Sequence, residues 1–381
     1  MISNVMHKKR WAKGLAGRDS LEKGITNRQM FFILILVIAA FRTTDIPQLA
    51  AKSMGRSGWI ILLAYAVPFS LIALMLAKLN NMFGGMTLYE YGSILLGKVL
   101  SRMLCVLFFI YLFSVLVFLN HNMSNLITMN FLPKTKPIFT LAAAITLFGF
   151  VVYKGTNTIA RLFELLGVLY VLATLILCLL MLTQSEIANI LPLYNPNEGA
   201  NFASSLLKFG AIYGGLENLL LIPFTKRNQG APKVAFFSII CVGILFVLIT
   251  EGSIGLIGVN NVTVYNDAFI EAIKLAEAPV IERMDIFYFT FGLTSLFSGL
   301  IIIIHSLVGI LLKMLPRAKR WLVVASVCAA SYAATLFVIT IPAYDLAYQH
   351  ALPVLVLIFA GAVPTLLFLL AKIKRRSSQE K

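Results

Sequence analysis

The chain has 381 residues, of which 59% are apolar and 13% are charged. Soluble globular domains have about 45–50% apolar and about 25% charged residues, so this composition excludes a water-soluble globular protein, a disordered chain and a large soluble domain. Lys and Arg total 32 against 16 acidic residues, a net charge of +16, and in a membrane protein such an excess marks cytoplasmic loops rather than a nucleic-acid partner.

Ten stretches are apolar enough, at about 20 residues each, to cross a membrane. They cover residues 29–51, 57–77, 101–129, 138–153, 161–182, 203–225, 234–257, 284–312, 321–341 and 350–371. The first follows a capping box formed by Thr26 and Gln29. The pattern predicts an all-α integral membrane protein with one transmembrane domain, 29–371, between basic tails at 1–28 and 372–381.

The distribution of cations predicts the orientation of these spans. With the N-terminus inside, most of the 32 cations fall in the tails and in the loops on the inner side. Cytoplasmic loops carry such an excess, so both termini are expected in the cytoplasm.

The first and sixth predicted spans are interrupted near mid-membrane. Arg42 and Asp45 bring charge to that depth in the first, and Pro47 removes a helix hydrogen bond. The sixth is interrupted at 210–217, where a double glycine precedes an acid. Backbone groups freed in hydrocarbon have to meet protein, water or a ligand. Each break alone also fits helix packing, because prolines are common in spanning helices and 210–214 forms a GxxxG pattern.

The longest predicted outer loop, about 258–283, contains a short amphipathic helix. Asn266 and Asp267 supply an Asx cap, and the apolar residues that follow recur at helical spacing. This helix is expected either to lie over the outer face of the bundle or to be an ordinary capped surface helix.

The ten spans divide into two halves of five, about 29–182 and 203–371, and each half begins with an interrupted span. An odd number of spans per half makes the second half inverted relative to the first, as in many secondary transporters. The two breaks then face each other in mid-membrane. Half-helix N-termini suit a carboxylate and exposed carbonyls suit an ammonium, so the pattern favours a zwitterion such as an amino acid.

Three ionisable residues within the spans are candidates for roles beyond packing, because charge at that depth is costly. Arg42 and Glu217 lie at comparable depth in the two interrupted spans. They can pair and lock these spans together; alternatively, Glu217 orients a ligand ammonium or carries a coupled proton. Glu164 is expected to pair with Arg161 or with a group of an inner gate.

Several sequence blocks give the chain a resemblance to a known family. They are Gly214-Gly215-Leu216-Glu217-Asn218 with Ile222-Pro223-Phe224 and Lys226-Arg227, Ile281-Glu282-Arg283-Met284-Asp285, Ala160-Arg161-Leu162-Phe163-Glu164-Leu165-Leu166, Asn189-Ile190-Leu191-Pro192, and Pro47 with Trp59. In these blocks the chain resembles the spore germination permease family, the B-type subunits of nutrient germinant receptors, which are related to the amino acid/polyamine/organocation transporters. Where that family usually has a Gly-x-Gly segment in helix one, this chain has Ala40-Phe41-Arg42.

The resemblance implies a 5+5 inverted-repeat, LeuT-like transporter fold of about ten helices, with helices one and six broken. It further implies a membrane subunit that binds a nutrient, an amino acid, and triggers spore germination. Its partners are then A-type and C-type receptor subunits in the inner membrane of a bacterial spore, with no cofactor or metal. Tyr111 and three hydroxyl residues of helix eight join the site because their helices flank it in this fold. The expected ligand-binding residues are Ala40, Phe41, Arg42, Thr43, Tyr111, Gly214, Gly215, Glu217, Thr290, Thr294 and Ser295.

Two functions of different class need the same pocket. Under one, the protein is a sensor whose occupancy changes its contacts with the partner subunits; under the other, it is a proton- or sodium-coupled amino-acid permease. A membrane enzyme is not indicated, since the sequence has no recognisable nucleophile motif, metal-ligand set or acid–base pair.

Overall fold

The computed structural model describes residues 24–379, except for 195–201, 223–228, 277–283 and 342, and helices make up most of that part. In the first half these are α2 (Asn27–Arg42), α3 (Ile46–Met54), η1 (Gly55–Ser57), α4 (Gly58–Met82), α5 (Leu88–Leu95), α6 (Lys98–Asn130), α7 (Pro137–Lys154), α8 (Thr156–Thr183) and α9 (Ile187–Ile190). In the second half they are α10 (Phe202–Phe209), η3 (Leu216–Leu220), α11 (Ala231–Ile257), α12 (Val259–Val264), α13 (Ala268–Leu275), α14 (Met284–Met314), α15 (Arg320–Ile339), α16 (Tyr344–Val356), η4 (Leu357–Ala362) and α17 (Val363–Gln379).

Eight helical stretches among the described residues are long and apolar enough to cross a membrane. They correspond to predicted spans two to five and seven to ten, which confirms a multi-pass membrane protein. The first and sixth predicted spans are the two that the structure divides. α2 ends at Arg42 before α3 begins, and turns at 210–215 separate α10 from η3. The apolar stretch that contains α4 begins earlier than predicted, at Ile46, because α3, η1 and α4 follow one another without a break.

α2 is the central helix of the bundle. It begins at the predicted capping box, in which the Gln29 amide donates to Thr26 Oγ1 over 3.4 Å and the Thr26 amide donates to Gln29 Oε1 over 3.1 Å. Every residue from Ile33 to Arg42 is buried, and α2 packs on α8, α11 and α14. A helix that is buried on all sides needs no polar face, so its apolar run is nearly continuous.

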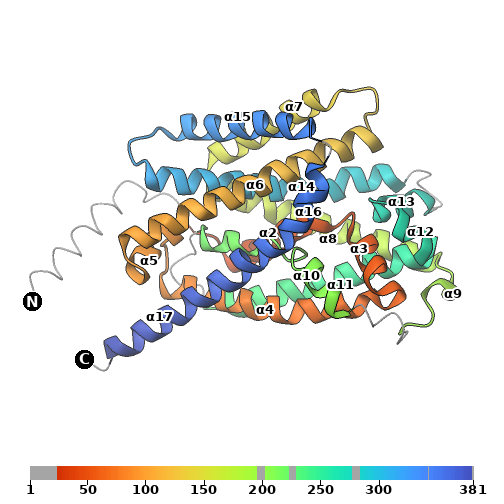
Figure 1. The fold of residues 1–381 in the computed structure, drawn as a ribbon, viewed down its shortest axis with the longest axis horizontal. Helices are drawn as coiled ribbons and strands as arrows, with labels where there is room; N and C mark the ends of the chain where they lie inside the picture. Colours follow the sequence, from red (N-terminus) through yellow and green to blue (C-terminus); the bar gives the residue numbers. More distant parts are fainter. Residues whose placement is uncertain (1–23, 195–201, 223–228, 277–283, 342, 380–381) are drawn as a thin grey trace, which may run out of the picture.

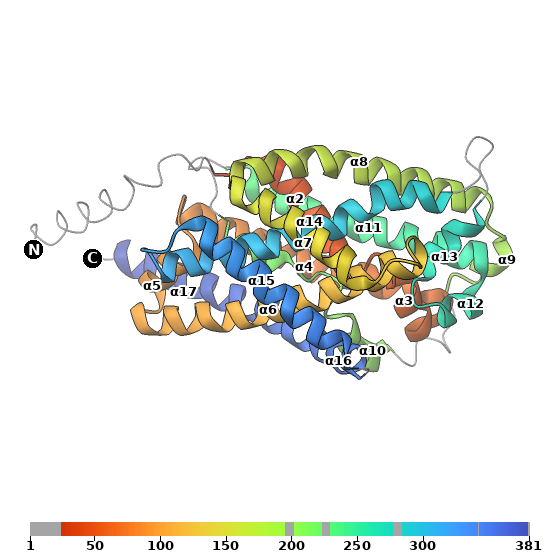
Figure 2. The same ribbon diagram turned by 90° about the horizontal axis from the view of Figure 1, so that it is seen from above.

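The long helices run side by side, so that the connections gather at two ends of the molecule (Figure 1; Figure 2). Figure 2 shows α5, the start of α8 and the last turns of α17 at one end, and α9, α12 and α13 at the other. We call the first the basic end, because Lys98, Lys154, Lys313, Lys319 and Lys374 lie in its helix ends and loops. We call the second the loop end.

The amphipathic helix predicted in the loop 258–283 is confirmed as α13, preceded by the short α12. The predicted Asx cap does not form: the Asp267 side chain makes no cap bond and lies close to Thr44 instead. The Asp267 carbonyl accepts the first helix bonds, from the amides of Ile270 and Glu271. Part of the family block at 281–285 lies outside the described residues.

Candidate functional site

The two helix breaks meet at Phe41 of α2 and the double glycine of the sixth span. A Cβ atom at Gly214 would lie 2.6 Å from Phe41 Cδ1, and one at Gly215 would lie 2.6 Å from Val37 Cγ1. Gly215 has a φ of 95°, which other residues rarely adopt. Glycine is therefore required at both positions because the α2 side chains approach closely, and at Gly215 also because of the backbone turn. The Phe41 side chain, 4% exposed, closes the space over both glycines.

The turn at Gly215 places the fully buried carboxylate of Glu217 between two neutral donors. Its Oε1 accepts the Tyr111 hydroxyl of α6 over 2.8 Å, and its Oε2 accepts the Gly215 amide over 2.9 Å. The positive φ turns the backbone so that this amide faces the side chain two residues on. Among the described residues, no cation forms an ion pair with Glu217.

The structure separates the two charges that the sequence could pair. Arg42 forms its ion pair with Asp45, three residues on, just beyond the end of α2. Pairing of Arg42 with Glu217 is therefore not observed, because a carboxylate closer in sequence takes the guanidinium. Of the two partners predicted for Glu164, Arg161 is wrong: Glu164 Oε1 lies 2.9 Å from Arg28 Nε. That ion pair joins α8 to α2 at the basic end.

A second polar cluster joins the end of α2 to α8 and α14. The Thr43 hydroxyl lies 3.4 Å from that of Tyr170, and the side chains of Thr174 and Ser295 lie close to the same Tyr170 hydroxyl. Ala40 packs on α14 nearby, since a Cβ at Gly299 would lie 2.3 Å from the Ala40 Cβ. Ala40, Thr43 and Ser295 thus lie together around the first break.

The two threonines predicted in α14 are placed differently. The Thr294 hydroxyl is half-buried and donates to the Phe291 carbonyl over 2.5 Å. Thr290 is exposed and donates to the Ile286 carbonyl over 3.0 Å. Thr290 does not lie with the buried Ser295, because five residues on an α-helix rotate the side-chain direction by about 140°.

Sequence reasoning missed three residues around Glu217. The Asn218 Nδ2 donates to the Gly215 carbonyl over 3.0 Å, and its Oδ1 accepts the Ser306 hydroxyl of α14 over 2.7 Å. The Phe359 ring stacks on Tyr111 with centroids 4.4 Å apart and planes 8° from parallel. The sequence did offer a signal for Asn218, because it follows Glu217 in a block that carries the family resemblance. Phe359 had no signal, because its segment reads as an ordinary apolar span, yet it forms the π-helical turn η4.

α12 and α13 cover the first break at the loop end. The Phe269 amide donates to the Thr44 carbonyl over 3.3 Å, and Gln48 Nε2 donates to the Thr263 carbonyl over 3.2 Å. Asp267 lies in this contact, outside the spans. Burial raises the pKa of its carboxyl group, and Asp45 and Glu271 raise it further, whereas the bond with Thr44 and the charge of Lys274 lower it.

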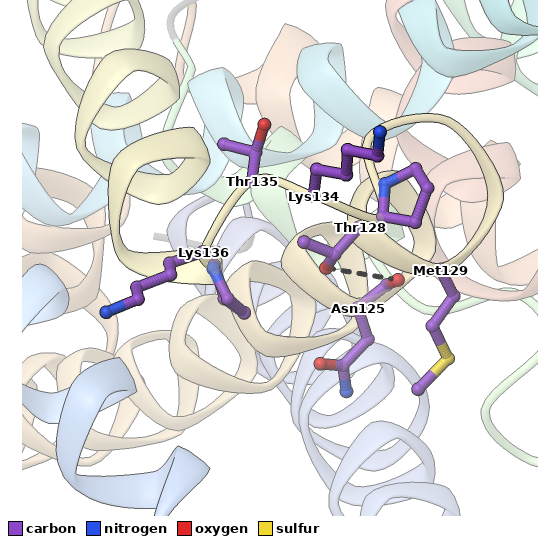
Figure 3. A pocket seen from close by; sticks show the side chains of 8 residues that line it. Asn125, Thr128, Met129, Lys134, Thr135 and Lys136 are labelled. Carbon is purple, nitrogen blue, oxygen red and sulfur yellow. Dashed lines mark hydrogen bonds between the residues drawn. The ribbon is translucent and has the colours of Figure 1, made fainter.

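A separate pocket of about 470 Å³ lies at the loop end, between α6 and the start of α7. Figure 3 shows Asn125, Thr128 and Met129 on one side of it and the segment with Lys134, Thr135 and Lys136 on the other. Asn125 also lies 2.9 Å from His121 Nε2, which in turn lies 3.0 Å from Asp345 Oδ2 of α16. In the part of the chain that the structure describes, no group of three or more His, Cys, Asp or Glu residues could hold a metal ion.

The sequence of the chain is similar to spore germination proteins, and its fold is similar to that of solved transporters. Residues 24–343 match a family model described as "Spore germination protein". Two curated relatives come from Bacillus subtilis strain 168. Spore germination protein YndE is 23% identical over 296 residues, 74% of this chain and 78% of the relative, and spore germination protein B2 is 24% identical over 280 residues, 70% and 73%.

Solved structures share the fold at low identity. A nucleobase-cation-symport-1 family transporter, Mhp1, in a closed conformation with bromovinylhydantoin bound, matches with a TM-score of 0.64 and 14% identity over 91% of this chain and 78% of the other. A sodium-coupled sialic acid symporter in a substrate-bound outward-open state matches with a TM-score of 0.61 and 12% identity, over 90% and 78%. The LeuT-like fold expected from the sequence is confirmed.

Proposed function

The chain belongs to the spore germination protein family, and from this premise we propose that it is the nutrient-binding membrane subunit of a spore germinant receptor. The ligand is an amino acid, and it binds between the two broken spans. The observation that carries the proposal is the carboxylate of Glu217, which is fully buried and held by two neutral donors. A buried anion without a paired cation is costly, and a ligand ammonium would offset that cost.

The carboxylate of a zwitterionic ligand needs a hydrogen-bond donor, and Arg42 supplies one. Its Nε is buried and has no hydrogen-bond partner among the described residues, although its Nη1 bonds with Asp45. A ligand carboxylate would satisfy this nitrogen, and charge-assisted hydrogen bonds of this kind are about twice as strong as neutral ones. One acid and one cation on facing breaks fit an amino acid better than a ligand of single charge.

The close packing of Phe41 on Gly214 and Gly215 gives ligand binding a conformational consequence. A ligand that enters between the breaks has to displace this ring, because the ring closes the space over both glycines. Displacement shifts the arrangement of α2 against the sixth span. A ligand that favours the displaced arrangement tenfold changes the balance by about 1.4 kcal/mol, enough to alter contacts with other subunits.

The proposal includes location and partners. The basic end faces the cytoplasm, both termini lie there, and the protein sits in the inner membrane of the spore beside A-type and C-type subunits. The repeats are 29–182 and 203–371, within one domain flanked by the tails 1–28 and 372–381. The excess of cations at the basic end supports this orientation, since cytoplasmic loops concentrate Lys and Arg.

The alternative is a working proton- or sodium-coupled amino-acid permease. The observation that favours it is the fold, which the chain shares with two symporters. Against it, Arg42 occupies the first break with a paired charge that would have to be re-paired or re-solvated in each transport cycle.

Binding and uptake by the purified protein test both functions. A panel of L-amino acids is first screened for thermal stabilisation, and the radiolabelled hit is then measured for binding in detergent and for uptake into proteoliposomes under a proton or sodium gradient. If the protein is a sensor, the radiolabelled amino acid should bind saturably to the wild type and not to Glu217→Gln. Its uptake into proteoliposomes should be slow or absent. Concentrative uptake by the wild type would establish the permease instead, and absence of binding to any amino acid would refute both.

A further inference from the structure

A groove of about 390 Å³ lies on the edge of the bundle between α7 and α15, and its lining contains no residue of either helix break. Figure 1 shows these two helices side by side along one edge of the molecule. The lining residues are Ile145, Thr146, Gly149, Tyr153, Trp321, Val324, Ala325 and Cys328. A Cβ at Gly149 would lie 3.0 Å from Cys328 Sγ, so the two helices meet closely at this point and the groove is shallow there.

The length of the groove matches one leaflet of a bilayer. Its lining covers 145–153 on α7 and 321–328 on α15, about 12 Å and about 11 Å at 1.5 Å per residue. It starts at the basic end, where α7 ends and α15 begins. Half of a hydrocarbon core about 30 Å thick is about 15 Å, so the groove runs from the membrane surface toward the mid-plane.

Cations surround the mouth of the groove. Lys154 is exposed at the end of α7, and Lys319 is exposed directly before α15. Arg320 Nη2 donates to the Val152 carbonyl over 3.1 Å, which holds the two helix ends together. The segments 150–163 and 314–320 contain no acidic residue. The mouth is thus positively charged, and an anionic group would complement it.

Two aromatic side chains flank the same mouth. Tyr153 is 51% exposed and Trp321 is 55% exposed, on opposite helices. Exposed Trp and Tyr residues are enriched where spanning helices pass through the headgroup layer, because one end of each ring is apolar and the other polar. Their position places the headgroup layer at the mouth and the acyl chains in the apolar part of the groove.

We propose that this groove binds one anionic phospholipid, with an acyl chain between α7 and α15 and its phosphate beside Lys154 and Lys319. In the orientation proposed above, the lipid belongs to the cytoplasmic leaflet; the site itself does not depend on the nutrient-binding function. A spanning helix of another protein is about 10 Å wide and would contact a face along the whole membrane, whereas this groove covers one leaflet and carries its charge at one end.

Quenching of Trp321 fluorescence by brominated lipids tests the site directly. The chain has three tryptophans, and the variant Trp11→Phe, Trp59→Phe leaves Trp321 as the only one. The variant is reconstituted into phosphatidylcholine vesicles that contain increasing fractions of brominated phosphatidylglycerol or of brominated phosphatidylcholine. We expect the anionic lipid to quench preferentially, with a relative binding constant of roughly 5 to 25, because each of the two lysines near the phosphate contributes up to about fivefold.

Matched variants test the charge at the mouth and the shape of the groove separately. In this background, Lys154→Gln with Lys319→Gln should bring the relative constant to about 1, whereas Lys134→Gln with Lys136→Gln at the loop end should leave it unchanged. Ala325→Phe fills the groove and should lower the preference, whereas Ala330→Phe, on another exposed side of α15, should not.

Three results would overturn the proposal. They are equal quenching by the two brominated lipids in the parent variant, a preference that survives loss of both lysines, and protection of Trp321 from both lipids alike. The last would mean that a helix of a second copy or of another protein fills the groove.

Discussion

The Tyr111 hydroxyl donates a hydrogen bond of 2.8 Å to the carboxylate of Glu217, and this contact ties α6 to the broken sixth span. Tyr111 is itself fixed by the Phe359 ring stacked on it. The acid at the centre of the proposed site is therefore held by a residue from the first half of the chain, supported by one from the second.

Loss of that hydroxyl should weaken ligand binding. Tyr111→Phe keeps the stack on Phe359 but leaves Glu217 with one donor, and a hydrogen bond to a charged group contributes about 1.5–3 kcal/mol. We expect roughly a tenfold to hundredfold rise in the Kd for the amino acid, measured by equilibrium binding. Tyr332→Phe is the control, because Tyr332 donates only a long 3.5 Å bond at the exposed edge of the bundle. Equal affinities in the two variants would show that Tyr111 does not position Glu217 for the ligand.

Replacing Gly214 or Gly215 by alanine should lower thermal stability, for a different reason at each position. Gly214→Ala places a Cβ against the Phe41 ring, so Phe41→Ala in the same chain should restore thermal stability. Gly215→Ala is strained by its φ of 95°, at about 1–2 kcal/mol, so Phe41→Ala should rescue it less. Gly309→Ala, which meets no atom within 4 Å, should be neutral. Equal rescue at both positions would contradict the assigned role of the backbone turn.

A double-mutant cycle should show that Arg42 is coupled to Asp45 and not to Glu217. Arg42→Met and Asp45→Asn remove one ion pair, so their effects on stability should be non-additive by about 0.5–3 kcal/mol. Arg42→Met and Glu217→Gln should be additive within about 0.5 kcal/mol in the ligand-free protein. The measurement is chemical unfolding in detergent micelles. Strong coupling in the second cycle would mean that the guanidinium reaches Glu217.

Docking of α13 on the first break should weaken as pH rises. Burial raises the pKa of Asp267 above its usual 3.8, so the docked state binds the proton more tightly. The contribution of the Asp267 proton to the stability of docking is complete below pH 3.8. It is lost as pH rises through the higher pKa that Asp267 has in the docked state. Asp267→Asn should remove this dependence.

Hydrogen exchange of the amides in 268–275, corrected for its intrinsic pH dependence, measures this docking. Protection should fall with rising pH in the wild type and stay level in Asp267→Asn. The control is Glu271→Gln, on the same helix, which should retain a fall. A level profile in the wild type would show that Asp267 does not control docking.

The sequence by itself determined that the chain spans a membrane, roughly where its spans lie and which two are broken. These features follow from local chemistry. Apolar length sets a span, as at Lys98–Asn130, and a double glycine shortly before an acid marks a break, as at Gly215 and Glu217. The start of α2 was equally local, because Thr26 and Gln29 are within one helical turn.

Only the tertiary structure decided which side chains meet. Glu217 lies against Tyr111, the Phe359 ring stacks on Tyr111, and Asn218 meets Ser306, although these partners are far apart along the chain. Thr290 and Ser295 share a helix, yet one is exposed and the other buried. Such pairings depend on helix rotation and on packing between distant segments, and in a uniformly apolar chain no polar face signals that rotation in advance.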